Sequence, residues 1–82
     1  MTNDQILEAL NRVFCNIFDD KEMLLDLEMT ANDIEEWDSL NQIKIILACE
    51  ETFNLRLKPR EISALDNIGG MVDHLSKLLR QA

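Results

Sequence analysis

Glycine and proline are scarce in this chain, which has two glycines and one proline among its 82 residues. Because 46% of the residues are apolar, this composition argues against a disordered sequence. Basic residues are also few: 8 Lys and Arg stand against 16 Asp and Glu, for a formal net charge of -8. Such a charge repels nucleic acid and argues against a nucleic-acid-binding function. It either attracts proteins with basic patches or only keeps a small domain soluble.

Residues that build metal centres and hydrolytic sites are rare as well. Cys15 and Cys49 form no CxxC pair and no zinc pattern, and Asp19-Asp20 lacks the alternating acids and the glycine of a calcium loop. The one histidine, His74, lies beside Asp73, where we expect it to face solvent, and no G-x-S-x-G is present. We therefore expect no metal site and no hydrolase.

Long apolar runs are absent, so we expect no membrane span. The first ten residues carry acid where a signal peptide needs base. Two unpaired cysteines without a secretion signal suggest a reducing, cytoplasmic setting. The length fits a single domain over residues 1–82.

Two helices are predicted in the first two thirds of the sequence. Apolar residues recur at helical intervals over residues 6–18, and Thr2 with Gln5 has the spacing of a capping box. Asp38 is a good N-cap for a second helix over residues 39–53. The apolar arc of this second helix is broad, so we expect it to be covered on more than one side.

The connection between these helices, residues 19–37, shows no single apolar period. We predict an ordered loop that packs inward, with a short turn after Thr30, because structureless loops of this length are uncommon in compact domains. Pro59 suits the first position of a short helix that reaches about Ala64.

The last helix is predicted to follow a cap at Asp66 or Asn67. Gly69 and Gly70 lie in its first turns, where each costs about 1 kcal/mol relative to alanine. We therefore expect a close approach to a neighbouring helix. The predicted fold class is all-α: a bundle of three longer helices and a short third helix, with a long first connection.

The start and end of the second helix carry a functional pattern. Asp38-Ser39-Leu40 begins it, and Glu50-Glu51-Thr52-Phe53 closes it. This pattern resembles the phosphopantetheine attachment site of acyl carrier proteins, and the resemblance continues through the loop at residues 30–34 and the segment 55–75. A serine near a helix start is usually only part of a cap. Here length, charge and helix layout agree with the motif, which favours the carrier interpretation.

The resemblance implies a four-helix bundle of the acyl-carrier type with 4'-phosphopantetheine attached covalently to Ser39. It implies a non-catalytic, monomeric carrier of acyl thioesters for fatty acid, polyketide or other specialised biosynthesis. Asp38 would hold the helix start and assist recognition by the phosphopantetheinyl transferase. Further partners would be acyl-transferring, ligase or synthase enzymes with basic patches.

By position, the family resemblance also implies an acyl pocket and a partner-binding surface. Candidate pocket residues, which would fill the core in any case, are Ile43, Ile46, Leu47, Ile62, Leu65, Ile68 and Val72. Candidate partner-binding residues are Trp37, Leu40, Asn41, Lys44, Glu50 and Glu51.

Three residues depart from the pattern of bulk fatty acid synthesis. Asn41 and Lys44 stand where that type commonly has acids, which should weaken contacts with enzymes that bind a continuous acidic stripe. Trp37 is either a partner anchor or packs under the loop. These features suggest a free-standing member of a specialised pathway. The alternative is a helical adaptor that binds a protein without a prosthetic group and uses Ser39 only as part of a cap.

Overall fold

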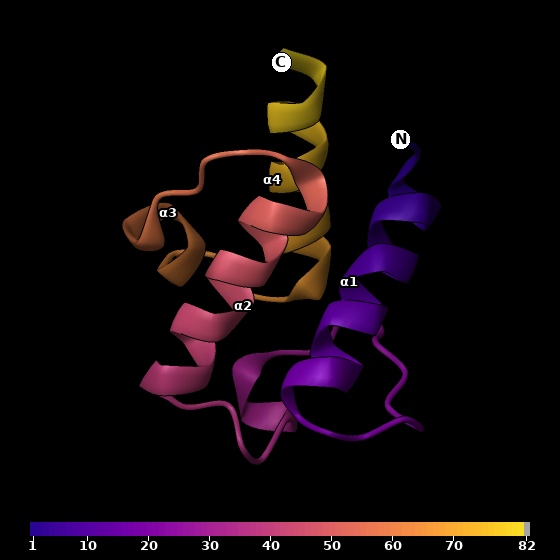
Figure 1. The fold of residues 1–82 in the computed structure, drawn as a ribbon, viewed down its shortest axis with the longest axis vertical. Coiled ribbons are helices and arrows are strands. Elements are labelled where there is room, and N and C mark those ends of the chain that lie inside the picture. The colour runs from indigo at the N-terminus through magenta and orange to yellow at the C-terminus, as the bar shows by residue number, and fades with distance from the viewer. Residues whose placement is uncertain (82) are drawn as a thin grey trace.

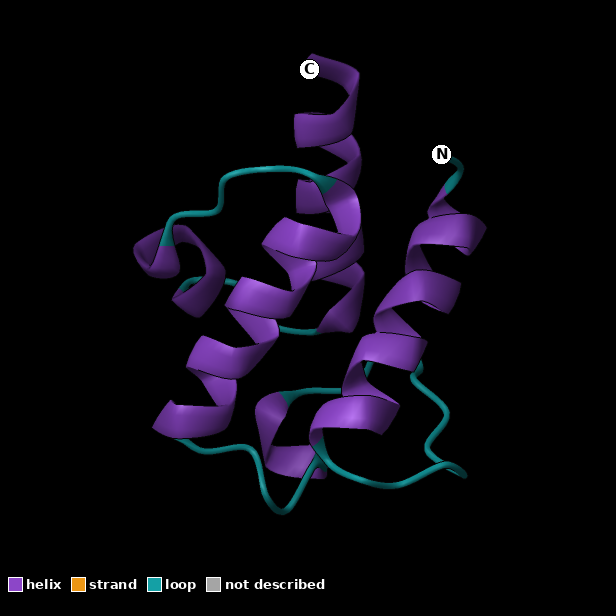
Figure 2. Ribbon diagram, viewed as in Figure 1, coloured by secondary structure: helices purple, strands orange, loops and turns teal. Residues whose placement is uncertain are grey.

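The computed structural model describes residues 1–81. Helices and turns account for all regular structure in this part of the chain, and none of the helices is long and apolar enough to cross a membrane (Figure 2). The elements are α1 (Asn3–Ile17), a 3-10 turn η1 (Ala31–Asp33), α2 (Ser39–Phe53), α3 (Pro59–Ser63) and α4 (Ile68–Gln81). The structure confirms the predicted all-α class with one short third helix.

The helices are arranged around α1, which packs against both α2 and α4, while α3 packs against α2. Both termini lie at one end of the bundle, and the connection between α1 and α2 crosses the other end (Figure 1). The connection contacts the first turn of α4 and leads into α2, whose first residue is Ser39.

The core is formed by the apolar stripes of α1 and α4 together with one face of α2. Ile6, Leu10 and Phe14 of α1 are fully buried, as are Ile45 of α2 and Leu75 of α4. α2 packs against both α1 and α3, which agrees with the prediction that it is covered on more than one side, but one apolar face of the helix stays open. Its exposed fractions are 61% at Leu40, 56% at Ile43 and 59% at Leu47, because no other element packs over this face.

Local side-chain chemistry fixes the helix starts. The Thr2 hydroxyl accepts a hydrogen bond from the Gln5 amide at 3.2 Å, and the Gln5 side chain accepts one from the Thr2 amide at 2.8 Å. This confirms the predicted capping box. Phe18 caps the end of α1, and Asp19 follows with a φ of 51°, so the chain leaves the helix there as expected.

The long connection is ordered by a side chain of α1. The Asn11 carboxamide oxygen accepts a hydrogen bond from the Leu25 amide at 2.6 Å, and its NH2 donates to the Met23 carbonyl oxygen at 3.1 Å. Further along, η1 is the short turn predicted after Thr30. A single asparagine therefore satisfies two backbone groups of a segment that has no regular structure of its own.

The connection also contacts the start of α4. The Ile68 amide donates to the Met29 carbonyl oxygen at 2.8 Å, and the Gly69 amide donates to the Leu27 carbonyl oxygen at 2.7 Å. A Cβ atom on Gly69 would lie 3.0 Å from that Leu27 oxygen. The expectation that these glycines approach a neighbouring helix is wrong, since the close neighbour of Gly69 is loop backbone.

Candidate functional site

Ser39 is the first residue of α2, and its side chain is exposed. Asp38 precedes it with an extended backbone, and its carboxylate accepts a hydrogen bond from the Asn41 amide at 2.8 Å. The Asp38 carbonyl oxygen accepts from the Gln42 amide at 2.9 Å. The amides of Ser39 and Leu40 have no partner in the described part of the chain, so two N–H groups at the positive end of the helix dipole remain available beside the serine.

A hollow of about 410 Å³ opens directly beside Ser39. Its walls come from the α1–α2 connection, the start of α2, the end of α3 and the start of α4. The lining residues are Met29, Thr30, Ala31, Trp37, Asp38, Ser39, Gln42, Ile62, Ser63, Leu65, Asp66, Asn67, Ile68 and Met71. The inner wall is apolar, because Ile62, Ile68 and Met71 are buried, whereas Ser63 and Asp66 are exposed at the rim.

The structure divides the predicted pocket residues into three groups. Ile62, Leu65 and Ile68 line the hollow, as α3 and the start of α4 face the first turn of α2. Ile46 and Val72 are buried in the closed core and do not line it. Ile43 and Leu47 differ from the prediction in another way, because they lie on the uncovered face of α2 and point away from the bundle interior.

Trp37 packs under the loop, which is one of its two predicted roles. Its ring meets Phe14 edge to face, with the ring centroids 5.2 Å apart and an interplanar angle of 77°. The indole Nε1 donates to the Gln42 side-chain oxygen at 2.5 Å. Both the ring and its polar atom are thus engaged within the chain, and the tryptophan forms part of the hollow's wall.

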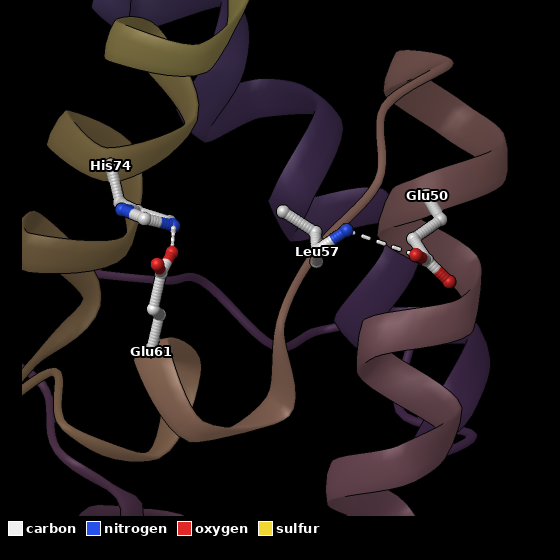
Figure 3. Close-up of polar contacts among 4 residues, drawn as sticks. All are labelled: Glu50, Leu57, Glu61 and His74. Atoms are coloured by element: carbon white, nitrogen blue, oxygen red, sulfur yellow. Dashed lines mark hydrogen bonds and ion pairs between the residues drawn. The ribbon is translucent and has the colours of Figure 1, made fainter.

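The candidate partner-binding residues differ in how free their side chains are. Leu40, Lys44 and Glu51 are exposed. The side-chain NH2 of Asn41 donates a hydrogen bond to the Glu36 carbonyl oxygen at 2.7 Å and so helps hold the turn before α2. The Glu50 carboxylate accepts a hydrogen bond from the Leu57 amide at 2.9 Å and ties the α2–α3 connection to α2 (Figure 3).

His74 does not face solvent, contrary to the prediction from its position beside Asp73. Its side chain is only 19% exposed, and Nε2 lies 3.5 Å from the Glu61 carboxylate of α3 (Figure 3). The nitrogen has no hydrogen bond in the described structure, so the contact is a charge interaction when the imidazole is protonated. The prediction failed because α3 covers this side of α4.

Several residues around the serine were not predicted from the sequence. Gln42 follows Ser39 by three positions, which is the spacing of neighbours on one helix face, and this signal was present in the sequence. Asn67 was predicted only as a cap, and its side-chain oxygen does accept a hydrogen bond from the Gly70 amide at 2.8 Å. Met29 and Thr30 had no local signal, because only the path of the connection brings them to the hollow.

Within residues 1–81, no group of three or more His, Cys, Asp or Glu side chains is arranged to hold a metal ion. The polar groups that surround the serine are instead backbone amides, hydroxyls, carboxamides and two carboxylates. These groups suit an anion on the serine oxygen and a neutral organic group in the hollow.

Known proteins match both the sequence and the fold. The family model described as phosphopantetheine attachment site matches residues 5–75. Among solved structures, the solution structure of a holo acyl carrier protein from Geobacter metallireducens is similar, with a TM-score of 0.84 and 34% sequence identity. The matched region covers 93% of this chain and 87% of that one.

Proposed function

Because the chain belongs to the family of phosphopantetheine attachment-site carrier proteins, we propose that Ser39 is the attachment residue and that the protein carries acyl groups. The observation that supports this most directly is the exposed Ser39 side chain at the first position of α2. A hydroxyl in this place is open to a modifying enzyme. When attached, 4'-phosphopantetheine supplies a terminal thiol that holds an acyl group as a thioester.

The surroundings of Ser39 fit a phosphate-linked group. The phosphodiester would be an anion, and the amides of Ser39 and Leu40 are two donors at the positive end of α2. Asp38 keeps this helix start formed by accepting from the Asn41 amide. No metal is needed for the bond between the serine oxygen and phosphorus to persist. The role of the chain's own residues is to present the serine and to position the arm.

We further propose that α2 meets the partner enzymes. Leu40 and the exposed face that continues with Ile43 and Leu47 give an apolar strip next to the serine. Glu51 and the net charge of -8 favour enzymes with basic patches, namely a phosphopantetheinyl transferase and acyl-transferring, ligase or synthase enzymes. Lys44 interrupts the acidic surface, which favours a specialised pathway, polyketide biosynthesis included, over bulk fatty acid synthesis.

The proposed setting is a monomer in the cytoplasm. Both cysteines are free in the structure, which agrees with a reducing compartment. Binding through α2 requires its apolar face to be open, which a monomer provides.

The test is intact mass after incubation with coenzyme A and a broad-specificity phosphopantetheinyl transferase. We expect the wild type to gain the mass of one arm and Ser39→Ala to gain none. Ser63→Ala is the matched control, because Ser63 is an exposed serine on the rim of the same hollow and should leave modification unchanged. An unmodified wild type under several transferases would instead favour an adaptor that binds a protein through the apolar face of α2.

A further inference from the structure

The positive charge of this acidic chain is concentrated after α2. Residues 1–54 carry 3 basic and 13 acidic side chains, whereas residues 55–82 carry 5 basic and 3 acidic ones. Three of those five cations, Arg56, Lys58 and Arg60, stand at alternate positions of one short segment. This segment, residues 55–60, contains the connection from α2 to α3 and the first two residues of α3. We call it the basic link.

The backbone of the basic link is held by one glutamate of α2. The Leu55 amide donates to the Glu50 carbonyl oxygen at 3.1 Å, and the Leu57 amide donates to the Glu50 carboxylate at 2.9 Å (Figure 3). Leu57 is buried, while Arg56 and Lys58 on either side of it are exposed. This alternation is that of an extended segment, in which neighbouring side chains point to opposite sides. Both cations therefore point away from the core.

The three cations are not neutralised by carboxylates in contact with them. Within residues 1–81, none of them forms an ion pair, although Glu61 follows Arg60 directly in the sequence. The Glu61 carboxylate lies instead 3.5 Å from His74 Nε2 of α4. The basic link thus presents three exposed positive charges on a backbone that is fixed by hydrogen bonds.

The basic link and the most acidic segment lie at opposite ends of α2 (Figure 1). Residues 19–38, which lead into α2, carry 9 acidic side chains and 1 basic one. The 15 residues of α2 span about 22 Å at 1.5 Å per residue. The screening length in physiological salt is about 8 Å, so the two patches act on a partner as separate charges.

This distribution of charge selects among possible anionic partners. Nucleic acid and anionic lipid surfaces are negative throughout, and the net charge of -8 repels them from the rest of the chain. A protein surface can carry both signs. The partner that fits has an acidic cluster opposite the basic link and basic groups opposite the start of α2.

We propose that the basic link is a second interaction surface, which binds an acidic cluster on a partner protein. On the basis of the proposed function, that partner is one of the enzymes that act on the arm. The opposite charges at the two ends of α2 then fix the direction in which this helix lies on the enzyme. An enzyme whose docking face is basic throughout is repelled by Arg56, Lys58 and Arg60, which makes the basic link a determinant of partner choice.

The probe for the test is a peptide of four lysines, four glycines and four glutamates in that order, whose charges sum to zero. Fully extended, its two charged blocks lie up to about 28 Å apart, which is enough to reach along α2. A nitroxide is attached to either end of the peptide, and NMR spectra of the unmodified protein show which amide signals it broadens. We expect the label at the glutamate end to broaden residues 55–60 most and the label at the lysine end to broaden residues 19–38 most. Both effects should be lost in 1 M salt, where the screening length is about 3 Å.

Arg56→Gln with Lys58→Gln should remove most of the broadening that the glutamate end causes at residues 55–60, and adding Arg60→Gln should abolish it. Arg12→Gln with Lys21→Gln is the matched control, because it removes the same charge from two exposed positions that lie outside the basic link. The control should keep the pattern of the wild type. Each substitution alone gives a graded version of the test if a multiple variant does not fold.

Equal broadening by the two ends in the wild type would overturn the proposal. So would a pattern that survives in the triple variant, because the three cations would then serve only the stability of the end of α2. A labelled single-stranded RNA that broadens residues 55–60 more than the peptide does would replace the acidic protein with a nucleic acid. Since the unmodified protein is used, a failure here leaves the attachment of the arm to Ser39 untouched, and a wild type that never gains the arm leaves the charge-directed binding standing but not its assignment to an enzyme.

Discussion

The amide of Gly69 lies 2.7 Å from the carbonyl oxygen of Leu27 and donates a hydrogen bond to it, which joins the first turn of α4 to the α1–α2 connection. The neighbouring bond from Ile68 to Met29 extends this junction. Met29 and the two residues after it form one wall of the hollow beside Ser39. The junction thus positions part of this wall as well as stabilising the fold.

We expect Gly69→Ala to destabilise the protein by about 1–2 kcal/mol, although alanine has the better helix propensity. The new Cβ atom would lie 3.0 Å from the Leu27 oxygen, and that oxygen is held in place by the bond it accepts. Gly70→Ala is the matched control, since its Cβ atom would make ordinary contacts, the shortest being 3.5 Å to the Asn67 oxygen. Urea unfolding measures both, and equal stability of the two variants would contradict this account.

Asp38→Ala should cost about 1 kcal/mol of folding stability, measured on the unmodified protein by chemical denaturation. The carboxylate accepts the hydrogen bond from the Asn41 amide that closes the first turn of α2. Asp38→Asn keeps an oxygen at the same place, so it should lower folding stability by only a few tenths of a kcal/mol. If the asparagine variant loses as much as the alanine variant, the charge of Asp38 and not its hydrogen bond stabilises the helix start.

Helix starts were predictable because their chemistry is local. Thr2, Asp38 and Pro59 each act within one turn of their own position, and α1, α2 and α3 begin where these residues predicted. Ser39 was also placed correctly as the exposed first residue of α2. This much of the candidate site depends on sequence alone.

The rest of the site depends on contacts between distant segments. Asn11 orders the loop from a helix twelve or more residues away, and no sequence pattern marks it. His74 was misplaced because its neighbours along the chain do not reveal that Glu61 of α3 lies over it. The outward position of Ile43 was missed because the sequence of α2 does not distinguish an apolar face that is covered by another element from one that is exposed.

Lys44→Glu should improve acceptance of the loaded carrier by a fatty acid synthesis enzyme with a basic docking patch, by about two- to fivefold in kcat/KM at low salt. Lys44 is exposed on α2 near the proposed attachment residue, where its positive charge repels a basic partner. Lys77→Glu makes the same change of charge on α4 and should have a smaller effect. Salt should reduce the gain at position 44. An equal gain from both variants would indicate net charge alone and not docking through α2.

The buried thiol of Cys49 should make folding stability fall in alkaline solution. Burial raises the pKa of this thiol from 9.0 to about 12, because the thiolate is poorly solvated inside the core. Well below pH 9 the thiol is protonated in both the folded and the unfolded protein, and its ionisation does not affect stability. Between pH 9 and pH 12 the unfolded chain loses the proton while the folded chain keeps it, so rising pH favours unfolding.

From pH 8 to pH 10, ionisation of Cys49 in the unfolded chain should lower the free energy of unfolding by about 1.4 kcal/mol. Cys49→Ala should be less stable at neutral pH, because it loses buried contacts, but it should lack this part of the pH dependence. The measurement is urea unfolding of both proteins at pH 8, 9 and 10, with the free energy of the variant subtracted from that of the wild type at each pH. Lys, Arg and Cys15 are common to both chains and cancel in the subtraction. A difference that stays constant across this range would mean that the Cys49 thiol titrates alike in the folded and unfolded protein, and that the core does not exclude water from it.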